Sequence, residues 1–432
     1  MLKQNKILGT IIFLIVVIVG SSCKSIQKTP KMDRNLADIY NPSQAGIHPS
    51  FSTFHFNDSS SIVYLRIFPN ELMFSEANET GKSLAKISIS YKLFEYGTDG
   101  IEVIPADSVN IEKTLNQAQE RNVFFTALPI KARSGLRYSL QIYIKDELRP
   151  MISKTYLLID KTSPFSRQNF QVLSKKTRYP AFTDNFKTTE KFLIKFNKSG
   201  FDSIYVDYFN MDRTLPRPIL SLTPDIAMQT SPDSTWKLLF TDSSVFSLDL
   251  QGIYMFKMAE NSSTGLTLYN FGENFPRIKN TDDLLGPLVY LCSAAEYGDL
   301  RRQANRKLAI DNYWLNIANK DMDASRELIR VYYNRVLYAN WYFSSYKEGW
   351  KTDRGMMYII FGPPDLLEKN SDEEIWSYRS KRTGTKLEFK FIRNATALSM
   401  EDFILDRNSS SSAVWVQAVE SWKRGKIYST EL

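Results

Sequence analysis

Alternating hydrophobic and polar residues mark a series of short β-strands in the first part of the chain. In residues 86–93 every second position is apolar, namely Ile87, Ile89, Tyr91 and Leu93. Successive side chains of a strand point to opposite faces, so this pattern places the apolar groups on one face of an antiparallel strand. Similar segments lie at 62–68, 123–128, 138–144 and 152–159. About seven short strands at this spacing predict a sandwich of two β-sheets over residues 51–162.

A second group of strands follows Pro164. Apolar segments bounded by turn residues lie at 191–196, 203–209, 236–240, 245–250, 253–258 and 266–271. They predict a second sandwich over residues 167–275. The expected fold class is therefore multidomain and mainly β, with two β-sandwich (Ig-like) domains ahead of an α+β C-terminal part.

The pattern becomes helical near Thr281. This threonine and the two aspartates after it offer a capping side chain and early negative charge, which favour a helix start. Apolar residues then recur at helical spacing as far as Phe343 and predict about three helices within residues 281–348. Several tyrosines share this spacing. They form either a binding stripe or, as we favour, part of a buried core.

Residues 349–355 read Gly-Trp-Lys-Thr-Asp-Arg-Gly and follow the last of these helices. Gly349 is expected to close the helix in the left-handed conformation. Thr352 and Asp353 carry short acceptors that suit a turn, and Gly355 permits an exit that a β-carbon would obstruct. These residue types indicate a structural turn rather than a reaction centre.

An apolar segment without alternation, residues 356–361, comes directly after this turn. Such a segment is typical of a strand that is covered on both faces. Gly362, Pro363 and Pro364 are expected to end the strand, because proline has no N–H to donate to a neighbouring strand.

Two further segments, 374–378 and 386–392, also have strand patterns. With the preceding strand they predict a small antiparallel sheet over residues 356–393, packed on the helices as an α+β unit over residues 281–432. Trp415 and Trp422 then recur at helical spacing in a last short helix, either a lid on the sheet, which we favour, or a tail.

The motif Gly349-Trp350-Lys351-Thr352-Asp353-Arg354-Gly355, then an apolar segment, then Gly-Pro-Pro-Asp resembles the bacterial GWxTD domain family. The resemblance covers about the last third of the chain and implies an architecture and an envelope setting, but no reaction or ligand. We expect Trp350 to fill a pocket between the helix end and the sheet, and Asp353 to cap the turn.

The N-terminus has the pattern of an export signal. Lys3 and Lys6 precede the apolar residues 7–19, and Gly-Ser-Ser leads into Cys23. At ~1.5 Å per residue the apolar segment spans about 20 Å, less than the ~30 Å of a bilayer core, which favours a cleaved signal peptide over residues 1–22. The pattern is similar to a bacterial lipobox, with Gly20 where an aliphatic residue is usual.

An acylated Cys23 would become the first residue of the mature chain and bind membrane lipid. The alternatives are an ordinary signal peptide cut nearby and an uncleaved anchor. Residues 23–50 are polar and predict a flexible tether. Residue 24 is Lys rather than Asp, so by resemblance to lipoprotein sorting rules we expect the outer membrane, facing the periplasm.

Composition adds two constraints. With 432 residues, 43% of them hydrophobic, the chain can bury real cores and form roughly two to four domains. Removal of residues 1–22 takes away two lysines and lowers the net charge from +8 to +6 (8 − 2). In an exported protein this surplus favours anionic lipid or acidic envelope polymers as partners, and not nucleic acid.

Residues with catalytic or metal-binding potential are few. His48 and His55 are the only histidines, and we predict no catalytic residue, no metal ligand and no cofactor. Cys292 lies in an apolar helical context and is expected to be a buried thiol. Asp353 and Asp365 flank a predicted strand and would lie about 20 Å apart, too far for an acid/base pair.

We favour a non-catalytic protein at the outer membrane that binds or scaffolds an outer-membrane protein complex or an envelope polymer. One alternative is an enzyme that acts on glycan or peptide, with Asp353 as acid or base and Trp350 as a platform in a cleft. Another is a passive spacer between membrane and cell wall.

Overall fold

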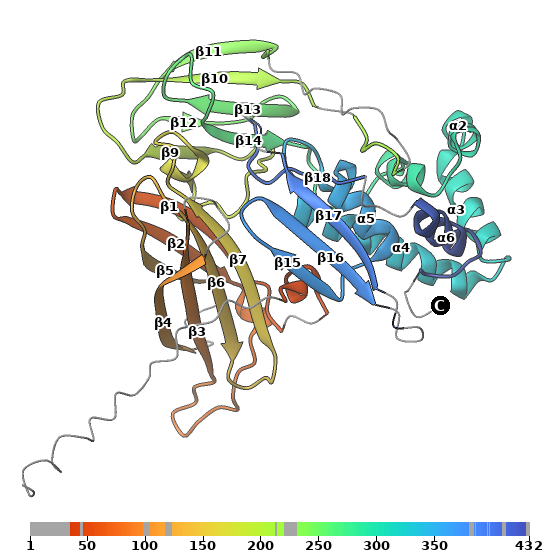
Figure 1. The fold of residues 1–432 in the computed structure, drawn as a ribbon, viewed down its shortest axis with the longest axis horizontal. Helices are drawn as coiled ribbons and strands as arrows, with labels where there is room; N and C mark the ends of the chain where they lie inside the picture. The colour runs from red at the N-terminus through yellow and green to blue at the C-terminus, as the bar shows by residue number, and fades with distance from the viewer. Residues whose placement is uncertain are drawn as a thin grey trace, which may run out of the picture. The chain divides into compact units, whose positions relative to one another are not determined.

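The structure is a computed structural model, and its described residues belong to one compact unit, Met32–Leu432 (Figure 1). Cys23 and the expected signal peptide lie outside the described residues. None of the described helices is long and apolar enough to cross a membrane. The described residues are 35–43, 46–97, 103–116, 123–211, 214–219, 231–379, 384, 386–394, 396, 398–407 and 412–428.

Two antiparallel sheets form the first part of the described chain. One has the order β1-β2-β5 and the other β4-β3-β6-β7. Their apolar residues share one core, which includes Val63 and Leu65 of one sheet and Ile87 and Ile89 of the other, so the predicted alternation in residues 86–93 is confirmed. The strands are β1 (Ser50–Asn57), β2 (Ser60–Ile67), β3 (Leu84–Tyr96), β4 (Val103–Asn116), β5 (Phe124–Lys131), β6 (Arg137–Asp146) and β7 (Ile152–Asp160).

Two more antiparallel sheets follow, with the orders β12-β9-β8 and β11-β10-β13-β14. They share a second core rich in phenylalanine, in which Phe192 contacts Phe186, Phe246 and Phe256. The strands are β8 (Phe170–Ser174), β9 (Phe192–Phe196), β10 (Ser203–Phe209), β11 (Ser234–Leu239), β12 (Val245–Phe246), β13 (Gly252–Lys257) and β14 (Leu266–Asn270).

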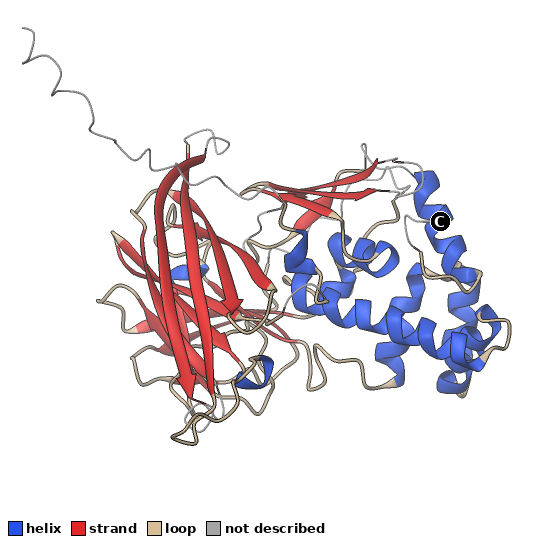
Figure 2. Ribbon diagram, turned by 90° about the horizontal axis from the view of Figure 1, so that it is seen from below, coloured by secondary structure: helices blue, strands red, loops and turns tan. Residues whose placement is uncertain are grey.

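The helices lie together beside a fifth sheet of order β15-β16-β17-β18 (Figure 2). The first helix starts where the sequence predicts, although Asn280 rather than Thr281 is its cap. The helices are α1 (Thr281–Leu285), α2 (Ala294–Arg302), α3 (Arg306–Ile317), α4 (Met322–Phe343), α5 (Asp353–Phe361) and α6 (Ser412–Lys423), and the strands are β15 (Leu366–Lys369), β16 (Glu373–Arg379), β17 (Lys386–Arg393) and β18 (Phe403–Leu405). Short 3₁₀ helices are η1 (Ala37–Tyr40), η2 (Pro69–Glu71), η3 (Arg167–Asn169), η4 (Gly286–Tyr290) and η5 (Gly349–Lys351).

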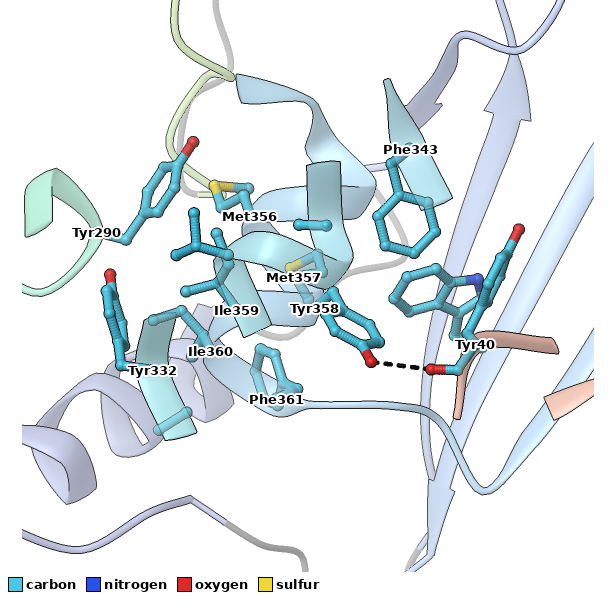
Figure 3. Close-up of a cluster of buried hydrophobic side chains, with 14 of the residues drawn as sticks. Tyr40, Tyr290, Tyr332, Phe343, Met356, Met357, Tyr358, Ile359, Ile360 and Phe361 are labelled. Carbon is cyan, nitrogen blue, oxygen red and sulfur yellow. Dashed lines mark hydrogen bonds between the residues drawn. The ribbon is translucent and has the colours of Figure 1, made fainter. Parts of the chain in front are cut away.

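The predicted strand over residues 356–361 is wrong, because these residues form most of α5. All nine residues of α5 are buried, and a helix that is hydrophobic on every side needs no alternation or stripe. Figure 3 shows its side chains enclosed by rings that include Tyr290, Tyr332 and Phe343. The small sheet consequently runs from Leu366 to Leu405 instead of over residues 356–393.

The last helix, α6, packs on the helix α5, where we expected either a lid on the sheet or a tail. Trp422 is fully buried, and its indole N–H donates a hydrogen bond of 3.0 Å to the carbonyl oxygen of Ile360 near the end of α5. Trp415 contacts Phe361 with a ring-centroid distance of 6.1 Å.

Part of the expected tether is folded onto the C-terminal sheet. The backbone N–H of Leu36 donates to the carbonyl oxygen of Leu367 of β15 over 2.8 Å, and the Asn35 side chain accepts from the Leu367 N–H over 3.2 Å. Leu36, Ala37 and Tyr40 are buried in the same core as α5. The prediction of a tether over residues 23–50 is therefore wrong for residues 35–40, because three apolar side chains there have a core to enter.

Candidate functional site

Gly349 lies where the backbone of η5 touches the backbone of α4. A β-carbon at this position would lie 1.9 Å from the carbonyl oxygen of Ala339, and no side chain fits there. The Gly349 N–H donates to the hydroxyl of Ser344, the residue that caps the C-terminus of α4. The glycine is therefore required by close approach, and not by the left-handed conformation that we expected.

Gly355 meets a similar restriction inside the first turn of α5. A β-carbon there would lie 1.8 Å from the carbonyl oxygen of Gly349. The two glycines thus bring α4, η5 and α5 into direct backbone contact, and residues 349–355 form a joint between the two helices.

Thr352 is the N-cap of α5. Its hydroxyl accepts a hydrogen bond of 3.0 Å from the N–H of Gly355 and donates one of 2.8 Å to the carbonyl oxygen of Gly349. Such a side chain satisfies an N–H that the helix itself leaves unpaired. The expected turn role of Thr352 agrees with this geometry.

Trp350 packs on η4 and not on the sheet. A β-carbon on Gly286 would lie 3.0 Å from the Trp350 ring, so the ring packs directly against this glycine. The same ring makes an edge contact with the Tyr290 ring, with 6.2 Å between the centroids. The Tyr290 hydroxyl donates to the Trp350 carbonyl oxygen over 2.6 Å. Trp350 is half-buried and holds η4 against η5, so the expected pocket beside the sheet is wrong.

Asp353 is the first residue of α5, and its carboxylate is engaged at both oxygens. Arg407 donates to Oδ1 over 2.6 Å and to Oδ2 over 3.0 Å, and the N–H of Leu405 donates to Oδ2 over 2.8 Å. Both charged side chains are under 10% exposed. Thr352 thus provides the cap that we expected from Asp353, and Asp353 instead ties α5 to β18 and to Arg407.

Arg354 enters the core and meets a buried carboxylate. Its Nη1 donates to Glu374 Oε1 over 2.8 Å, and Lys369 donates to the same oxygen over 2.8 Å. Burial alone would raise the pKa of Glu374, but Lys369 and Arg354 outweigh it and lower the pKa to about 2. Glu374 is therefore a structural anion at neutral pH.

Three cations surround the ring of Phe403. The guanidinium carbons of Arg354 and Arg393 lie 4.3 and 4.6 Å from its centroid, and Lys369 Nζ lies at 5.3 Å. Arg354 Nε and Arg393 Nη2 are buried and have no hydrogen-bond partner in the described part of the chain. The negative face of the ring compensates part of this charge.

Gly362 and the two prolines after it end α5 instead of a strand. Gly362 has φ +81°, which favours glycine, and its carbonyl oxygen accepts a hydrogen bond of 2.9 Å from the Tyr378 hydroxyl. Pro364 is buried, whereas Pro363 borders a groove beside α4.

The two histidines have separate surroundings. His55 lies in β1. Its Nδ1 is 2.9 Å from the Ser61 hydroxyl, and its Nε2 is 2.9 Å from the Asp160 carbonyl oxygen. Burial lowers its pKa to about 4. His48 is exposed near Glu71. Across the described ranges, no three His, Cys, Asp or Glu side chains are grouped closely enough to hold a metal ion.

Cys292 is half-buried and unpaired within the described part of the chain, and burial raises the pKa of its thiol. A raised pKa keeps the thiol protonated and lowers its reactivity. The thiol that we expected to be buried is thus partly exposed.

Sequence reasoning missed Arg354, Glu374 and Arg407. Glu374 had a usable signal, because it alternates with Trp376 and Tyr378 on the inward side of a strand, and a buried carboxylate requires a cationic partner. Arg407 had none, since its loop position says nothing about a partner 54 residues earlier.

The fold and the joint define an α+β domain in the C-terminal part of the chain. Residues 252–424 match the model of the GWxTD domain family, which confirms the resemblance for this segment. The match begins at β13, before the expected boundary near residue 281. Within this segment one apolar cluster joins Met255 and Tyr269 of β13 and β14 to Tyr346 and Leu398.

No curated protein sequence matches the chain. Similar solved structures include a glycosyl hydrolase family 2 member from Bacteroides cellulosilyticus, with 12% identity over 36% of this chain and 18% of that one, at a TM-score of 0.19. The red sea bream transglutaminase has 9% identity over 49% of this chain and 28% of its own, also at 0.19. The aligned parts thus span less than a third of either solved chain, and at these TM-scores neither likeness carries an argument.

Proposed function

We propose that this chain is a lipid-anchored protein of the bacterial cell envelope that binds or assembles other components at the outer membrane, facing the periplasm. The observation that carries the proposal is the N-terminal pattern: two lysines, the apolar residues 7–19, and Gly-Ser-Ser before Cys23. In this proposal the acyl chains on Cys23 hold the protein to membrane lipid, and the folded part carries the binding function.

We further propose that residues 51–162 and 167–275 are two Ig-like β-sandwich modules. The support is that each region contains two antiparallel sheets whose apolar rows share a core. Such modules present loops and sheet faces at their surface, which suits a binding or scaffold role.

The docking of residues 35–40 adds a constraint on the anchor. Twelve peptide units separate Cys23 from Asn35 (35 − 23 = 12). An extended chain covers at most ~3.3–3.6 Å per residue, so this link reaches about 40 Å. Because Asn35 and Leu36 are bonded to Leu367, the proposed anchor would keep the C-terminal domain close to the bilayer surface.

The residues of the enzyme alternative have structural contacts instead of a cleft. The Asp353 side chain is 8% exposed and holds Arg407 at both oxygens, and Trp350 lies against Gly286 and Tyr290. A general acid or base has to reach the proton that it transfers. We therefore propose the non-catalytic role alone.

The test is purification of the tagged, full-length protein from membranes in mild detergent, with co-purifying chains identified by mass spectrometry. Cys23→Ala removes the proposed acylation site, and Cys292→Ala is the matched control because it removes the other cysteine.

We expect a stoichiometric outer-membrane partner with the wild type and with Cys292→Ala, and its loss with Cys23→Ala. Recovery of the wild type alone, still membrane-bound, would contradict the assembly role and favour the passive spacer. Recovery of the same partner with Cys23→Ala would contradict the dependence on the anchor.

A further inference from the structure

A groove of about 320 Å³ lies beside α4 in the C-terminal domain. Its walls come from α4, from the segment Asn41–Ser43 after η1, and from Tyr358 and Pro363 at the end of α5. The volume falls within the range of small-ligand sites. The groove is separate from the buried contacts of Asp353 and Arg354.

Arg335 lines this groove and has no carboxylate partner in the described part of the chain. Its Nη1 donates to the carbonyl oxygens of Ile359 and Ile360 over 3.1 and 2.9 Å, and its guanidinium stacks on Trp422 at 5.3 Å. Burial lowers its pKa to about 10, so it stays charged at neutral pH.

The charge in the groove has one sign. Arg330 also lines it, and no Asp or Glu is among the described lining residues. Arg330 is partly neutralised by Glu327 on its own helix at 2.6 Å, so Arg335 contributes most of the unbalanced charge. Nη1 of Arg335 is engaged with the two carbonyl oxygens, and no described residue accepts from its Nε or Nη2. The Nε/Nη2 edge of a guanidinium can bind a carboxylate through two parallel hydrogen bonds.

Aromatic residues of α4 continue from the groove along the helix. Tyr338 lines the groove, and Trp341 follows it three residues later with its ring 6.0 Å from that of Tyr338. Trp341 is 58% exposed, whereas Trp314, Trp376 and Trp422 are fully buried. An exposed indole face beside hydrogen-bonding groups such as Asn334 is suited to the C–H face and hydroxyls of a sugar ring.

We propose that the groove binds an acidic oligosaccharide, with a sugar carboxylate on Arg335 and a neighbouring ring on Tyr338 and Trp341. Two arginines are too few for a nucleic-acid backbone, whose binding depends on many phosphate contacts. The inference deepens the proposed binding role and rests on it, since it names the ligand class of a non-catalytic envelope protein.

The test is calorimetric titration of the detergent-purified mature protein with a tetragalacturonate, and with maltotetraose as the neutral comparison. We expect binding of the acidic sugar only, weakened at least tenfold by Trp341→Ala. Trp236→Ala is the matched control, because Trp236 is also an exposed tryptophan (40%) but lies on β11. It should leave binding unchanged.

Arg335→Lys keeps the positive charge and removes the two-pronged geometry, so about tenfold weaker binding is expected while circular dichroism stays that of the wild type. Equal binding of both sugars, no binding at millimolar concentration, or equal losses with Trp341→Ala and Trp236→Ala would overturn the inference. Because this titration does not depend on Cys23, its failure leaves the anchor and co-purification tests of the proposed function standing.

Discussion

The hydroxyl of Tyr40 donates a hydrogen bond of 3.0 Å to Glu374, which joins side chains 334 residues apart in the sequence. Both are buried, and the carbonyl oxygen of Tyr40 accepts a second hydrogen bond from Tyr358 of α5 (Figure 3). The beginning of the described chain is therefore an integral part of the C-terminal domain. A pull on the proposed anchor would act directly on the domain that carries the joint.

Glu374→Gln should destabilise the C-terminal domain by about 3–5 kcal/mol, the usual cost of removing one partner of a buried ion pair. The physical reason is that Arg354 would lose the carboxylate it contacts in the core, and Lys369 would keep only the more distant carboxylate of Glu401, at 3.8 Å. Urea denaturation followed by tryptophan fluorescence measures the change. Glu368→Gln on the neighbouring strand is the control, since Glu368 is exposed. Equal stabilities of the two variants would contradict the buried network.

Gly355→Ala should destabilise by about 3 kcal/mol or more, because the new methyl group would collide with the Gly349 carbonyl oxygen. Gly298→Ala is a control within another helix. There the nearest atom is the flexible end of Arg302 at 3.4 Å, and the substitution should stabilise by roughly 0.5–1 kcal/mol. Thermal melting of both variants tests the prediction. A melting temperature of Gly355→Ala equal to that of the wild type would refute the joint.

Asp353→Asn should destabilise by about 3 kcal/mol, because it keeps the shape of the side chain but leaves Arg407 buried without its anion. Asp323→Asn, at an exposed pair with Arg326, should have a much smaller effect. Chemical denaturation compares the two. If Asp353→Asn folds with wild-type stability and abolishes an activity on glycan or peptide, the enzyme alternative is correct and the structural role is wrong.

His55 should make the protein less stable as the pH falls from about 6.5 to 4. Its pKa is lowered to about 4 by burial, so in this window the unfolded chain binds the proton and the folded chain does not. The stabilisation is complete above about pH 6.5, and at most about 3 kcal/mol is lost by pH 4. Denaturation midpoints of wild type and His55→Gln between pH 7 and 4.5 test this. A variant with the same pH slope as the wild type would exclude His55 as the cause.

Period-two alternation made the strands of the first part of the chain predictable, because a strand with one buried and one exposed face has apolar and polar residues in turn. The alternation in residues 86–93 agrees with the burial of Ile87, Ile89 and Leu93. In residues 356–361 the same reasoning failed, since a segment buried on all sides has no polar face to reveal its period. The length of the segment did not distinguish a helix from a strand either, because α5 has only nine residues.

The motif residues were found from the sequence, and the turn role of Thr352 was foreseen, but the contacts that require Gly349 and Asp353 were not. Gly349 is required by the carbonyl oxygen of Ala339 in α4, and Gly355 by that of Gly349 six residues earlier; neither close approach can be read from the residue types alone. Asp353 and Glu374 depend on partners that only the tertiary fold brings close. The groove at Arg335 was likewise invisible, since its walls come from segments about 300 residues apart.

The most direct test of the anchored state is metabolic labelling of the producing bacterium with radioactive palmitate, followed by membrane fractionation. The account predicts label on the wild type and on Cys292→Ala in the membrane fraction. It predicts none on Cys23→Ala, which should lose its membrane attachment. An unlabelled wild type, or a Cys23→Ala protein that stays labelled, would contradict the lipid anchor and with it the proposed place of this protein in the envelope.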